Sequence, residues 1–296
     1  MILPLPLPTD VGRAKLRRVA WGWAMGDKPG GYAGLNRFDR VDATGEAETF
    51  VEFLDRVEAL PETQARRRRS FDRLALRPGM AVAEIGCGSD TAARELAALV
   101  GPSGQVHGFD ISERFVALAR DRAAAANVAV HFEVADAGAL PLPDGSLDAY
   151  RAERVYMHLR QPEAALAEAF RVLRPGGRIL VMDQDWDMLI FDGEVAGTRA
   201  IAHAFADSMV NGKIARRMRP LLRDAGFDEI AIHPEANAIT DGERLGWMAD
   251  TAAKAALAAG LDAPMVNAWL DDQRRRIAED RFLYGMTHFV TCARRP

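Results

Sequence analysis

The segment Ala81–Asp90 constrains the fold of this chain more than any other. It reads AVAEIGCGSD, which is an apolar run with one carboxylate followed by two glycines one residue apart. An apolar run that ends at glycine is typical of a buried strand, and the alanine-rich stretch Thr91–Val100 carries Leu96, Leu99 and Val100 at helical spacing. A strand, a glycine turn and a helix in this order predict a nucleotide-type pocket at the carboxyl end of a parallel sheet.

The residues of the turn indicate which ligand this pocket accepts. Gly86 can adopt a backbone conformation that a side chain would forbid, and Gly88 lets the main chain approach a ligand closely. The N–H groups at the start of the next helix can bind an anionic group. A dinucleotide fingerprint has a third glycine where this chain has Thr91, and Glu84 would repel a pyrophosphate. The turn therefore favours a ligand with an ammonium group and a carboxylate, and S-adenosylmethionine has both.

Four further segments follow the turn in order. They are residues 106–112 (VHGFDIS), 132–137 (FEVADA), 142–148 (LPDGSLD) and 173–181 (LRPGGRILV). Together with Glu84–Gly88 they resemble the motifs of the class I S-adenosylmethionine-dependent methyltransferases, in the small-molecule group that includes the ubiquinone/menaquinone-biosynthesis type. Each segment alone is a weak signal, whereas five segments in this order and at this spacing are specific.

The resemblance implies an architecture. It implies an α/β fold with a Rossmann-like, seven-stranded, mostly parallel sheet that has helices on both faces. Residues 1–75 are expected to form an N-terminal helical cap that contributes to the acceptor pocket. Residues 76–296 are expected to form the catalytic domain, which binds S-adenosylmethionine as cosubstrate.

The later part of the chain departs from the common form of this group. Residues 187–226 read as mainly helical, and the last two strands are expected at Phe227–His233 and Gly285–Ala293. The long segment between these strands predicts a helical insertion at about 240–283, before the last strand. The insertion either covers the active site or forms a dimer contact.

The resemblance also implies cofactor contacts. Asp110 is expected to hold the ribose hydroxyls, because a carboxylate accepts two hydrogen bonds from a vicinal diol. Asp136 is expected beside the adenine amino group. The alternatives are that Asp110 caps the next helix in competition with Ser112, and that Asp136 is a turn residue before Gly138. The predicted cofactor-binding set is Glu84, Gly86, Cys87, Gly88, Asp110, Ile111, Asp136, Ala137 and Arg154.

Two residues in this region have other interpretations. Arg154 alternatively pairs with Glu153 or another acidic neighbour, or anchors a carboxylate of the acceptor. Asp90 occupies a position at which methyltransferases of this group usually have a third glycine. Its side chain is well suited to cap the helix that begins at Thr91, and its charge is expected near the carboxylate of the ligand.

Candidates for catalysis follow the fourth and fifth strands. Methyl transfer from a sulfonium requires alignment of the nucleophile, the methyl group and the sulfur, and an oxygen or carbon acid also needs a base. His158 lies in a segment that resembles the His-containing segment of many small-molecule O-methyltransferases, and histidine is a usable base at neutral pH. Asp183 is expected to orient His158 as the third group of a triad does. The alternative is that His158 packs or caps the next helix.

Three acids at the end of the fifth strand carry a separate hypothesis. Asp183, Asp185 and Asp187 fall on one face if this segment stays extended. Such a face suits magnesium, which prefers oxygen ligands, or a cationic amine acceptor. The simpler interpretation is a strand end with solvated acids, so we predict no bound metal.

Composition limits the partners. The 296 residues are 49% apolar and 27% charged, which is typical of a globular protein with a sizeable core. The net charge of −4 gives no basic field for nucleic acid, and the run Arg66–Arg69 is expected to be a solvated helix face. Cys87 and Cys292 lie far apart, which suits a reducing cytoplasm. No apolar run is long enough to span a membrane.

These observations predict a cytoplasmic S-adenosylmethionine-dependent methyltransferase of a small-molecule acceptor, with O- or C-methylation favoured over N-methylation. A homodimer is one alternative for its assembly, and neither nucleic acid nor membrane is expected as a partner. A second hypothesis keeps the fold and the cofactor but replaces transfer with a rearrangement or a scaffold role. After the fourth strand the chain reads YRAE, not the Asp/Asn-Pro-Pro-aromatic motif of amino-methylating nucleic-acid enzymes, so a nucleic-acid substrate is disfavoured.

Overall fold

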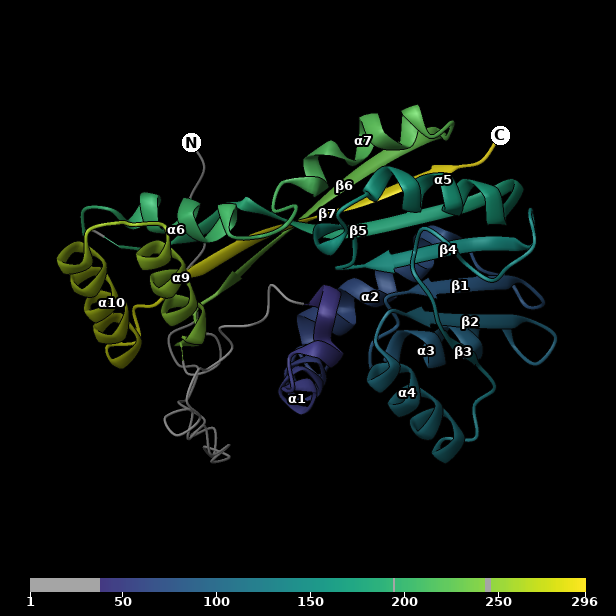
Figure 1. The fold of residues 1–296 in the computed structure, drawn as a ribbon, viewed down its shortest axis with the longest axis horizontal. Helices are drawn as coiled ribbons and strands as arrows, with labels where there is room; N and C mark the ends of the chain where they lie inside the picture. The colour runs from purple at the N-terminus through teal and green to yellow at the C-terminus, as the bar shows by residue number, and fades with distance from the viewer. Residues whose placement is uncertain (1–37, 194, 243–245) are drawn as a thin grey trace, which may run out of the picture. The chain divides into compact units, whose positions relative to one another are not determined.

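The computed structural model describes residues 38–193, 195–242 and 246–296. Its strands are β1 (Ala81–Ile85), β2 (Gln105–Asp110), β3 (His131–Val134), β4 (Leu147–Glu153), β5 (Leu173–Phe191), β6 (Asp228–Ile239) and β7 (Tyr284–Arg294). They form one sheet in the order β3-β2-β1-β4-β5-β7-β6 (Figure 1). Strands β1 to β5 pair in parallel, whereas β7 is antiparallel to both β5 and β6. The predicted Rossmann-like, seven-stranded, mostly parallel α/β fold is confirmed.

Helices cover both faces of this sheet. They are α1 (Ala47–Glu58), α2 (Pro61–Leu74), α3 (Thr91–Val100), α4 (Glu113–Ala125), α5 (Pro162–Val172), α6 (Thr198–Asp207), α7 (Ile214–Asp224), α9 (Trp247–Ala258) and α10 (Ala263–Ala278), with the 3-10 helices η1 (Phe38–Ala43) and η2 (Tyr156–His158). Successive residues of a buried strand point to opposite faces. Val82 therefore packs in a cluster with α2, α3 and α4, and Ala83 packs in a second cluster with α5, α6, α7, α9 and α10.

The first strand–turn–helix unit has the predicted bounds, because its signals are local. Gly86 has a φ of +63°, a conformation that favours glycine. A Cβ atom at Gly86 would also clash with the side chain of Val155, which follows β4. The turn after β1 thus lies directly against the turn after β4.

Strand β5 is longer than the sequence analysis predicted. It has 19 residues and continues to Phe191, so residues 187–191 are strand and not helix. The extension pairs with β7 as far as Phe191 and Tyr284, and the Phe191 ring lies 5.2 Å from the ring of Trp269 on α10. In Figure 1, α6, α9 and α10 lie around this extension, away from β1, β2 and β3. Pairing with β7 keeps this segment extended. This tertiary contact outweighs the helical tendency of the local sequence.

The insertion before the last strand is helical, as predicted, and consists of α9 and α10 between β6 and β7. The first 37 residues of the expected N-terminal cap lie outside the described part of the chain, and the division at residue 75 stays a prediction. None of the helices in the described ranges is both long and apolar enough to cross a membrane. Cys87 and Cys292 are both free thiols.

Candidate active site

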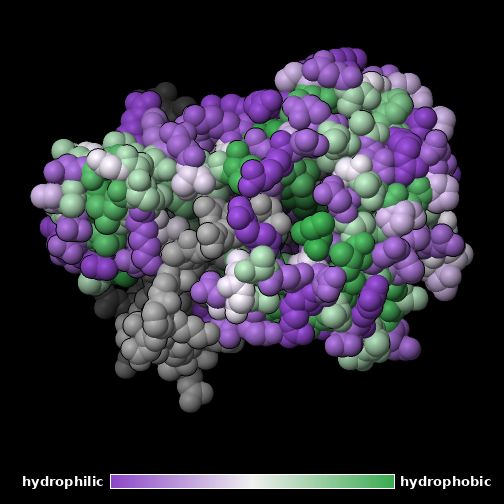
Figure 2. Space-filling model, viewed as in Figure 1, coloured by the Kyte–Doolittle hydropathy of each residue, from purple (hydrophilic) through white to green (hydrophobic). Residues whose placement is uncertain are grey.

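A cavity of about 530 Å³ lies at the carboxyl ends of β1, β2 and β4. Its walls come from the turns that follow these strands and from η1, α1, η2, β5, α6 and α9. In Figure 2, hydrophobic residues gather around a recess near the centre of the view. Ligands of open α/β sheets bind at this edge, where turns and helix N-termini meet, so the cavity is the candidate active site.

All nine residues predicted to bind the cofactor line this cavity, although they are spread over 71 positions from Glu84 to Arg154. The topology brings them together because β1, β2, β3 and β4 are neighbours in the sheet. Their contacts with a cofactor stay a prediction. The set is Glu84, Gly86, Cys87, Gly88, Asp110, Ile111, Asp136, Ala137 and Arg154.

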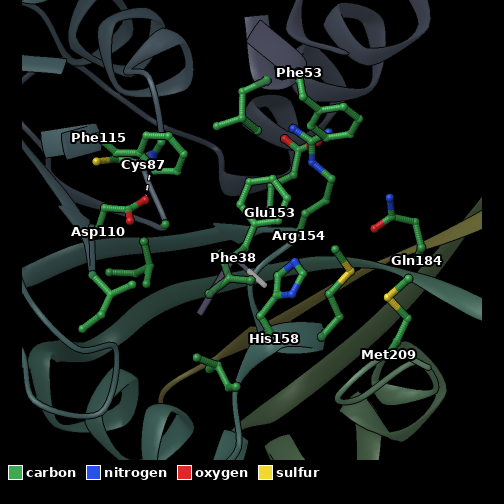
Figure 3. Close-up of a pocket in the computed structure, with 18 of the residues that line it drawn as sticks. Phe38, Phe53, Cys87, Asp110, Phe115, Glu153, Arg154, His158, Gln184 and Met209 are labelled. Carbon is green, nitrogen blue, oxygen red and sulfur yellow. Dashed lines mark hydrogen bonds between the residues drawn. The ribbon is translucent and has the colours of Figure 1, made fainter. Parts of the chain in front are cut away.

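Asp110 connects the end of β2 with the glycine turn. Its Oδ2 accepts a hydrogen bond from Gly88 N at 2.9 Å (Figure 3), and its Oδ1 accepts one from Ser112 N at 3.0 Å. The alternative role as helix cap is wrong, because Ser112 is the N-cap of α4 and its side chain accepts a hydrogen bond from Phe115 N. Burial raises the pKa of the Asp110 carboxyl. Each oxygen still has a lone pair that can accept a further donor.

Asp136 and Arg154 make the structural contacts that were expected as alternatives to cofactor binding, and both residues also line the cavity. Asp136 Oδ1 accepts a hydrogen bond from Gly138 N at 2.7 Å, which is the expected turn contact. Arg154 Nη2 lies 2.5 Å from Glu58 Oε1, so the salt bridge joins the end of β4 to α1. These contacts hold both side chains at the cavity. Neither contact prevents the residue from also binding a ligand.

Asp90 does not have the predicted capping role. It is the N-cap residue of α3, with φ +94°, but its side chain makes no capping hydrogen bond. Its carboxylate instead accepts a hydrogen bond from Arg94 Nε at 2.5 Å, one turn along the helix. Asp90 is fully buried and does not itself line the cavity, although Ser89 and Thr91 do, and the nearness of its charge to the ligand carboxylate stays a prediction.

The Glu84 carboxylate is paired within the protein. Arg151 lies opposite Glu84 in the register of β1 and β4 and forms an ion pair with Glu84 Oε1. The same guanidinium pairs with Glu153, and its Nε donates to Ser70 Oγ at 2.9 Å. Burial raises the pKa of Glu84 to about 7 in spite of Arg151. Glu84 Oε2 has no hydrogen-bond partner among the described residues, so it is available to a donor in the cavity.

The arginine run on α2 is partly buried, which corrects the expectation of a solvated helix face. Arg66 and Arg67 are only 3% and 2% exposed. Arg67 pairs with Glu58 and Glu95, and Arg66 Nη2 lies 3.6 Å from Glu153 Oε1. The physical reason is that α2 covers the strand ends where carboxylates are buried, and buried carboxylates require cations.

His158 is the last residue of η2 and is buried in the cavity wall, with its ring 5.3 Å from the ring of Phe38. Asp183 accepts no hydrogen bond from the His158 side chain, so the predicted orientation of His158 by Asp183 is not seen. Asp183 Oδ1 accepts a hydrogen bond from Met157 N at 3.3 Å, and its Oδ2 makes none within the described residues. Burial raises the pKa of Asp183 to about 8. Asp183 thus contacts the main chain of η2 and does not line the cavity.

The next two acids of β5 are paired with cations of α7 and the loop before it. Asp185 accepts hydrogen bonds from Arg216 at 2.5 and 2.7 Å. Asp187 lies 3.1 Å from Arg216 Nη1 and 3.8 Å from Lys213 Nζ. Asp185 and Asp187 are therefore already neutralised by these cations, and neither carboxylate needs a metal ion or a cationic acceptor to balance it. No group of three or more His, Cys, Asp or Glu side chains in the described ranges is arranged to hold a metal ion.

The opposite face of β5 supplies the cavity. Because side chains alternate along a strand, Gln184 points away from the side of Asp183 and Asp185. Trp186 packs on Phe205 of α6, with ring centroids 5.2 Å apart, and its Nε1 donates to Met157 Sδ at 3.3 Å. Gln184 and Trp186 line the cavity, and sequence reasoning missed both as site residues. For Gln184, the signal that could have found it is the same period of two that grouped the acids.

The remaining walls are mainly apolar and come from segments without a sequence motif. Phe53 of α1 packs edge-on against Trp247 of α9, with ring centroids 5.5 Å apart. Phe205 at the end of α6 and Met209 after it complete this part of the wall. The insertion before β7 therefore contributes to the cavity, which was one of its two predicted roles.

The cavity has two chemically different ends. In Figure 3, Asp110 and Cys87 lie on one side, Gln184 and Met209 lie on the other, and His158 lies between them. The first end has the carboxylates and the glycine turn that follow β1 and β2, and the second is lined mainly by aromatic and aliphatic side chains, with Gln184 among them. This arrangement suits a polar ligand and an apolar ligand that meet near His158.

Comparison with known proteins gives three findings on similarity. Residues 83–181 match a family described as a methyltransferase domain. The chain is 33% identical over 195 residues to the ubiquinone/menaquinone biosynthesis C-methyltransferase UbiE of Bordetella parapertussis, which covers 60% of this chain and 76% of that protein. It is 30% identical over 229 residues to the O-methyltransferase cnsE of Penicillium expansum, which covers 77% and 75%.

Among solved structures, the chain is similar to that of the 4+2 cyclase SpnF. It is 25% identical to this chain, covers 79% of this chain and 83% of its own, and has a TM-score of 0.51.

Proposed function

Because the chain belongs to the class I S-adenosylmethionine-dependent methyltransferases, in their small-molecule group, we propose that it methylates an oxygen or carbon atom of a bulky, largely apolar molecule. The observation that carries this proposal is that His158 lines the cavity between the polar end and the apolar end. A base at this position is within the space where a nucleophile meets a methyl group.

The polar end fits S-adenosylmethionine. Glu84 Oε2 is a buried acceptor that makes no hydrogen bond in the described chain, and it suits the ammonium group. Asp110 retains lone pairs for the ribose hydroxyls. The ten-residue helix α3 begins at Thr91, which lines the cavity, and its N-terminus suits the carboxylate. When bound, S-adenosylmethionine supplies a methyl group on a sulfonium, which is already a good leaving group.

The protein itself contributes alignment and proton removal. Holding the two reactants in line lowers the activation free energy by about 7–11 kcal/mol. His158 accepts the proton of the acceptor hydroxyl or carbon acid, which adds about 10²–10⁴-fold. Asp183 is a positioning residue, because it holds the main chain of η2 at Met157 N. The apolar side chains of α1, α6 and α9 exclude water and receive the body of the acceptor.

A second candidate function is the rearrangement of a bound molecule without methyl transfer. It is favoured by the likeness to a structure named as a 4+2 cyclase, at 25% identity over 79% of this chain. The fold and the polar end would be the same in that case, and His158 would have no proton to remove. The two functions differ in one product, S-adenosylhomocysteine.

Two measurements test the proposal. Isothermal titration calorimetry with S-adenosylmethionine and S-adenosylhomocysteine tests the polar end, and we expect both to bind. Incubation with S-adenosylmethionine and a panel of apolar phenols tests transfer, and we expect S-adenosylhomocysteine to form in proportion to a methylated phenol. If neither S-adenosylmethionine nor S-adenosylhomocysteine binds, both proposed functions are wrong. If the acceptor is converted and no S-adenosylhomocysteine forms, the rearrangement is supported and methyl transfer is excluded.

A further inference from the structure

Three oxygen atoms of cavity-lining residues are buried and make no hydrogen bond among the described residues. They are Glu84 Oε2, Glu153 Oε1 and Gln184 Oε1. Buried polar atoms in native proteins almost always have a hydrogen-bond partner, so we expect a bound ligand to donate to each of these atoms. Glu84 belongs to the polar end of the cavity and is accounted for there. Glu153 and Gln184 are not used by the proposed cofactor contacts.

Glu153 and Gln184 project from the same face of neighbouring strands. Glu153 is in register with Met182 across the parallel pair β4 and β5, and Gln184 lies two residues further along β5. Side chains two residues apart in a strand share a face. Glu153 Oε1 and Gln184 Oε1 thus form a pair of acceptors at the cavity wall, and Figure 3 shows the two residues on either side of Arg154.

The charges around this pair are balanced. The network at the strand ends comprises four carboxylates and four guanidiniums, linked by ion pairs: Glu58, Glu84, Glu95, Glu153, Arg66, Arg67, Arg151 and Arg154. The carboxylate of Glu153 already has Arg151 and Arg66 as counterions. Because Glu153 already has two counterions, a neutral donor can satisfy its remaining acceptor atom without adding a further charge.

The acceptors lie next to apolar side chains. Trp186, two residues further along β5, also lines the cavity, and in Figure 3 Met209 lies on the same side of the cavity as Gln184. A ligand that satisfies Gln184 therefore extends an apolar body over Trp186 and Met209. An alcohol or a phenol combines such a body with a neutral hydroxyl group.

We propose that Gln184 and Glu153 form a hydroxyl-recognition subsite, which selects a hydroxyl-bearing apolar acceptor by accepting hydrogen bonds from its neutral hydroxyl groups. The inference rests on the proposed function, because it assigns this end of the cavity to the acceptor. It adds the chemical class of the acceptor and a specificity-determining residue, Gln184.

The test uses the full chain saturated with S-adenosylhomocysteine and three naphthyl probes. These are 2-naphthol, 2-methoxynaphthalene, in which the hydroxyl is capped, and 1-naphthylmethylammonium. Calorimetry measures the Kd of each. We expect 2-naphthol to bind about tenfold more tightly than 2-methoxynaphthalene, since the capped probe leaves buried acceptors without a donor.

Variants of Gln184 assign the preference to the subsite. Gln184→Leu is expected to reduce the preference for 2-naphthol by about threefold or more, because it removes one of the two acceptors. Gln184→Glu keeps an acceptor oxygen and is expected to retain the preference. Gln105→Leu, the same substitution at an exposed position at the start of β2, is the matched control and should not change it. Glu153 is left intact because its carboxylate also holds Arg151 and Arg66.

The outcomes separate the two levels of the proposal. Absence of S-adenosylhomocysteine binding overturns the proposed function. With that binding intact, the subsite is overturned if the hydroxyl and capped probes bind equally, or if no naphthyl probe binds. It is also overturned if Gln184→Leu keeps the full preference, or if the ammonium probe binds most tightly, which would indicate an amine acceptor.

Discussion

Arg151 on β4 lies opposite Glu84 on β1, and their side chains form an ion pair that is almost completely buried. The same guanidinium pairs with Glu153, so one cation serves two carboxylates that line the cavity. Removal of one partner from such a network leaves uncompensated charge in the interior. The electrostatics of the cavity and the stability of the fold are therefore coupled through Arg151.

We expect Arg151→Leu to lower the free energy of unfolding by about 3–5 kcal/mol, because Glu84 loses its cation and Glu153 loses one of its two counterions. Equilibrium urea unfolding at pH 8, followed by circular dichroism, measures the loss. Arg274→Leu is the matched control, since Arg274 pairs with Asp250 at the surface and its loss should cost less than about 1 kcal/mol. Equal losses for the two variants would contradict the role of Arg151.

Asp183 predicts a pH dependence of stability. Its pKa in the folded protein is raised to about 8 by burial, whereas an unfolded aspartate has a pKa near 3.9. Between these values the folded chain holds a proton that the unfolded chain has released, so the contribution of Asp183 to stability is full below pH 4 and is lost as the pH rises to 8. Asp183→Asn removes this titration and keeps an oxygen for Met157 N.

The difference in unfolding free energy between Asp183→Asn and the native protein should therefore grow in favour of the variant, by up to about 1.4 kcal/mol per pH unit from pH 5 to pH 8. Urea unfolding of both proteins at each pH measures it. Asp271→Asn, at an exposed position, controls for the loss of one negative charge. A difference that stays constant with pH would show that Asp183 does not hold the proton.

His158→Ala should reduce the rate of methyl transfer by about 10²–10⁴-fold, the usual contribution of a placed base. Its affinity for S-adenosylhomocysteine should remain, because His158 lies apart from Asp110 at the polar end. The rate is measured as S-adenosylhomocysteine formation with a phenol that the native protein methylates. His131→Ala, at an exposed position of β3, is the matched control. An unchanged rate removes His158 from the mechanism.

Asp110→Asn should weaken S-adenosylhomocysteine binding by about tenfold or more, because a carboxylate forms stronger hydrogen bonds than an amide. Asp90→Asn should change this affinity by less than about twofold, since the Asp90 carboxylate pairs with Arg94 outside the cavity. Calorimetry on both variants measures the contrast. A comparable loss for Asp90→Asn would mean that its charge does reach the ligand.

The sequence by itself determined the part of the molecule whose signals are local. The strand β1, the turn at Gly86 and the helix α3 are encoded in twenty consecutive residues, Ala81–Val100, by an apolar run, a glycine and a helical period. The nine predicted cofactor residues line one cavity because parallel strands end at the same edge of a sheet, and this rule needs only the strand order.

Only the tertiary structure decided what each face of an element meets. The acids of β5 could be grouped from the sequence, but the pairing of Asp185 with Arg216 and the exposure of Gln184 to the cavity depend on α7 and on the neighbouring strands. Arg66 on α2 looked solvated because its counterion Glu153 lies 87 positions away in the chain. Pairing of buried charges and contact between distant helices are set by the packed fold, and no local pattern carries that information.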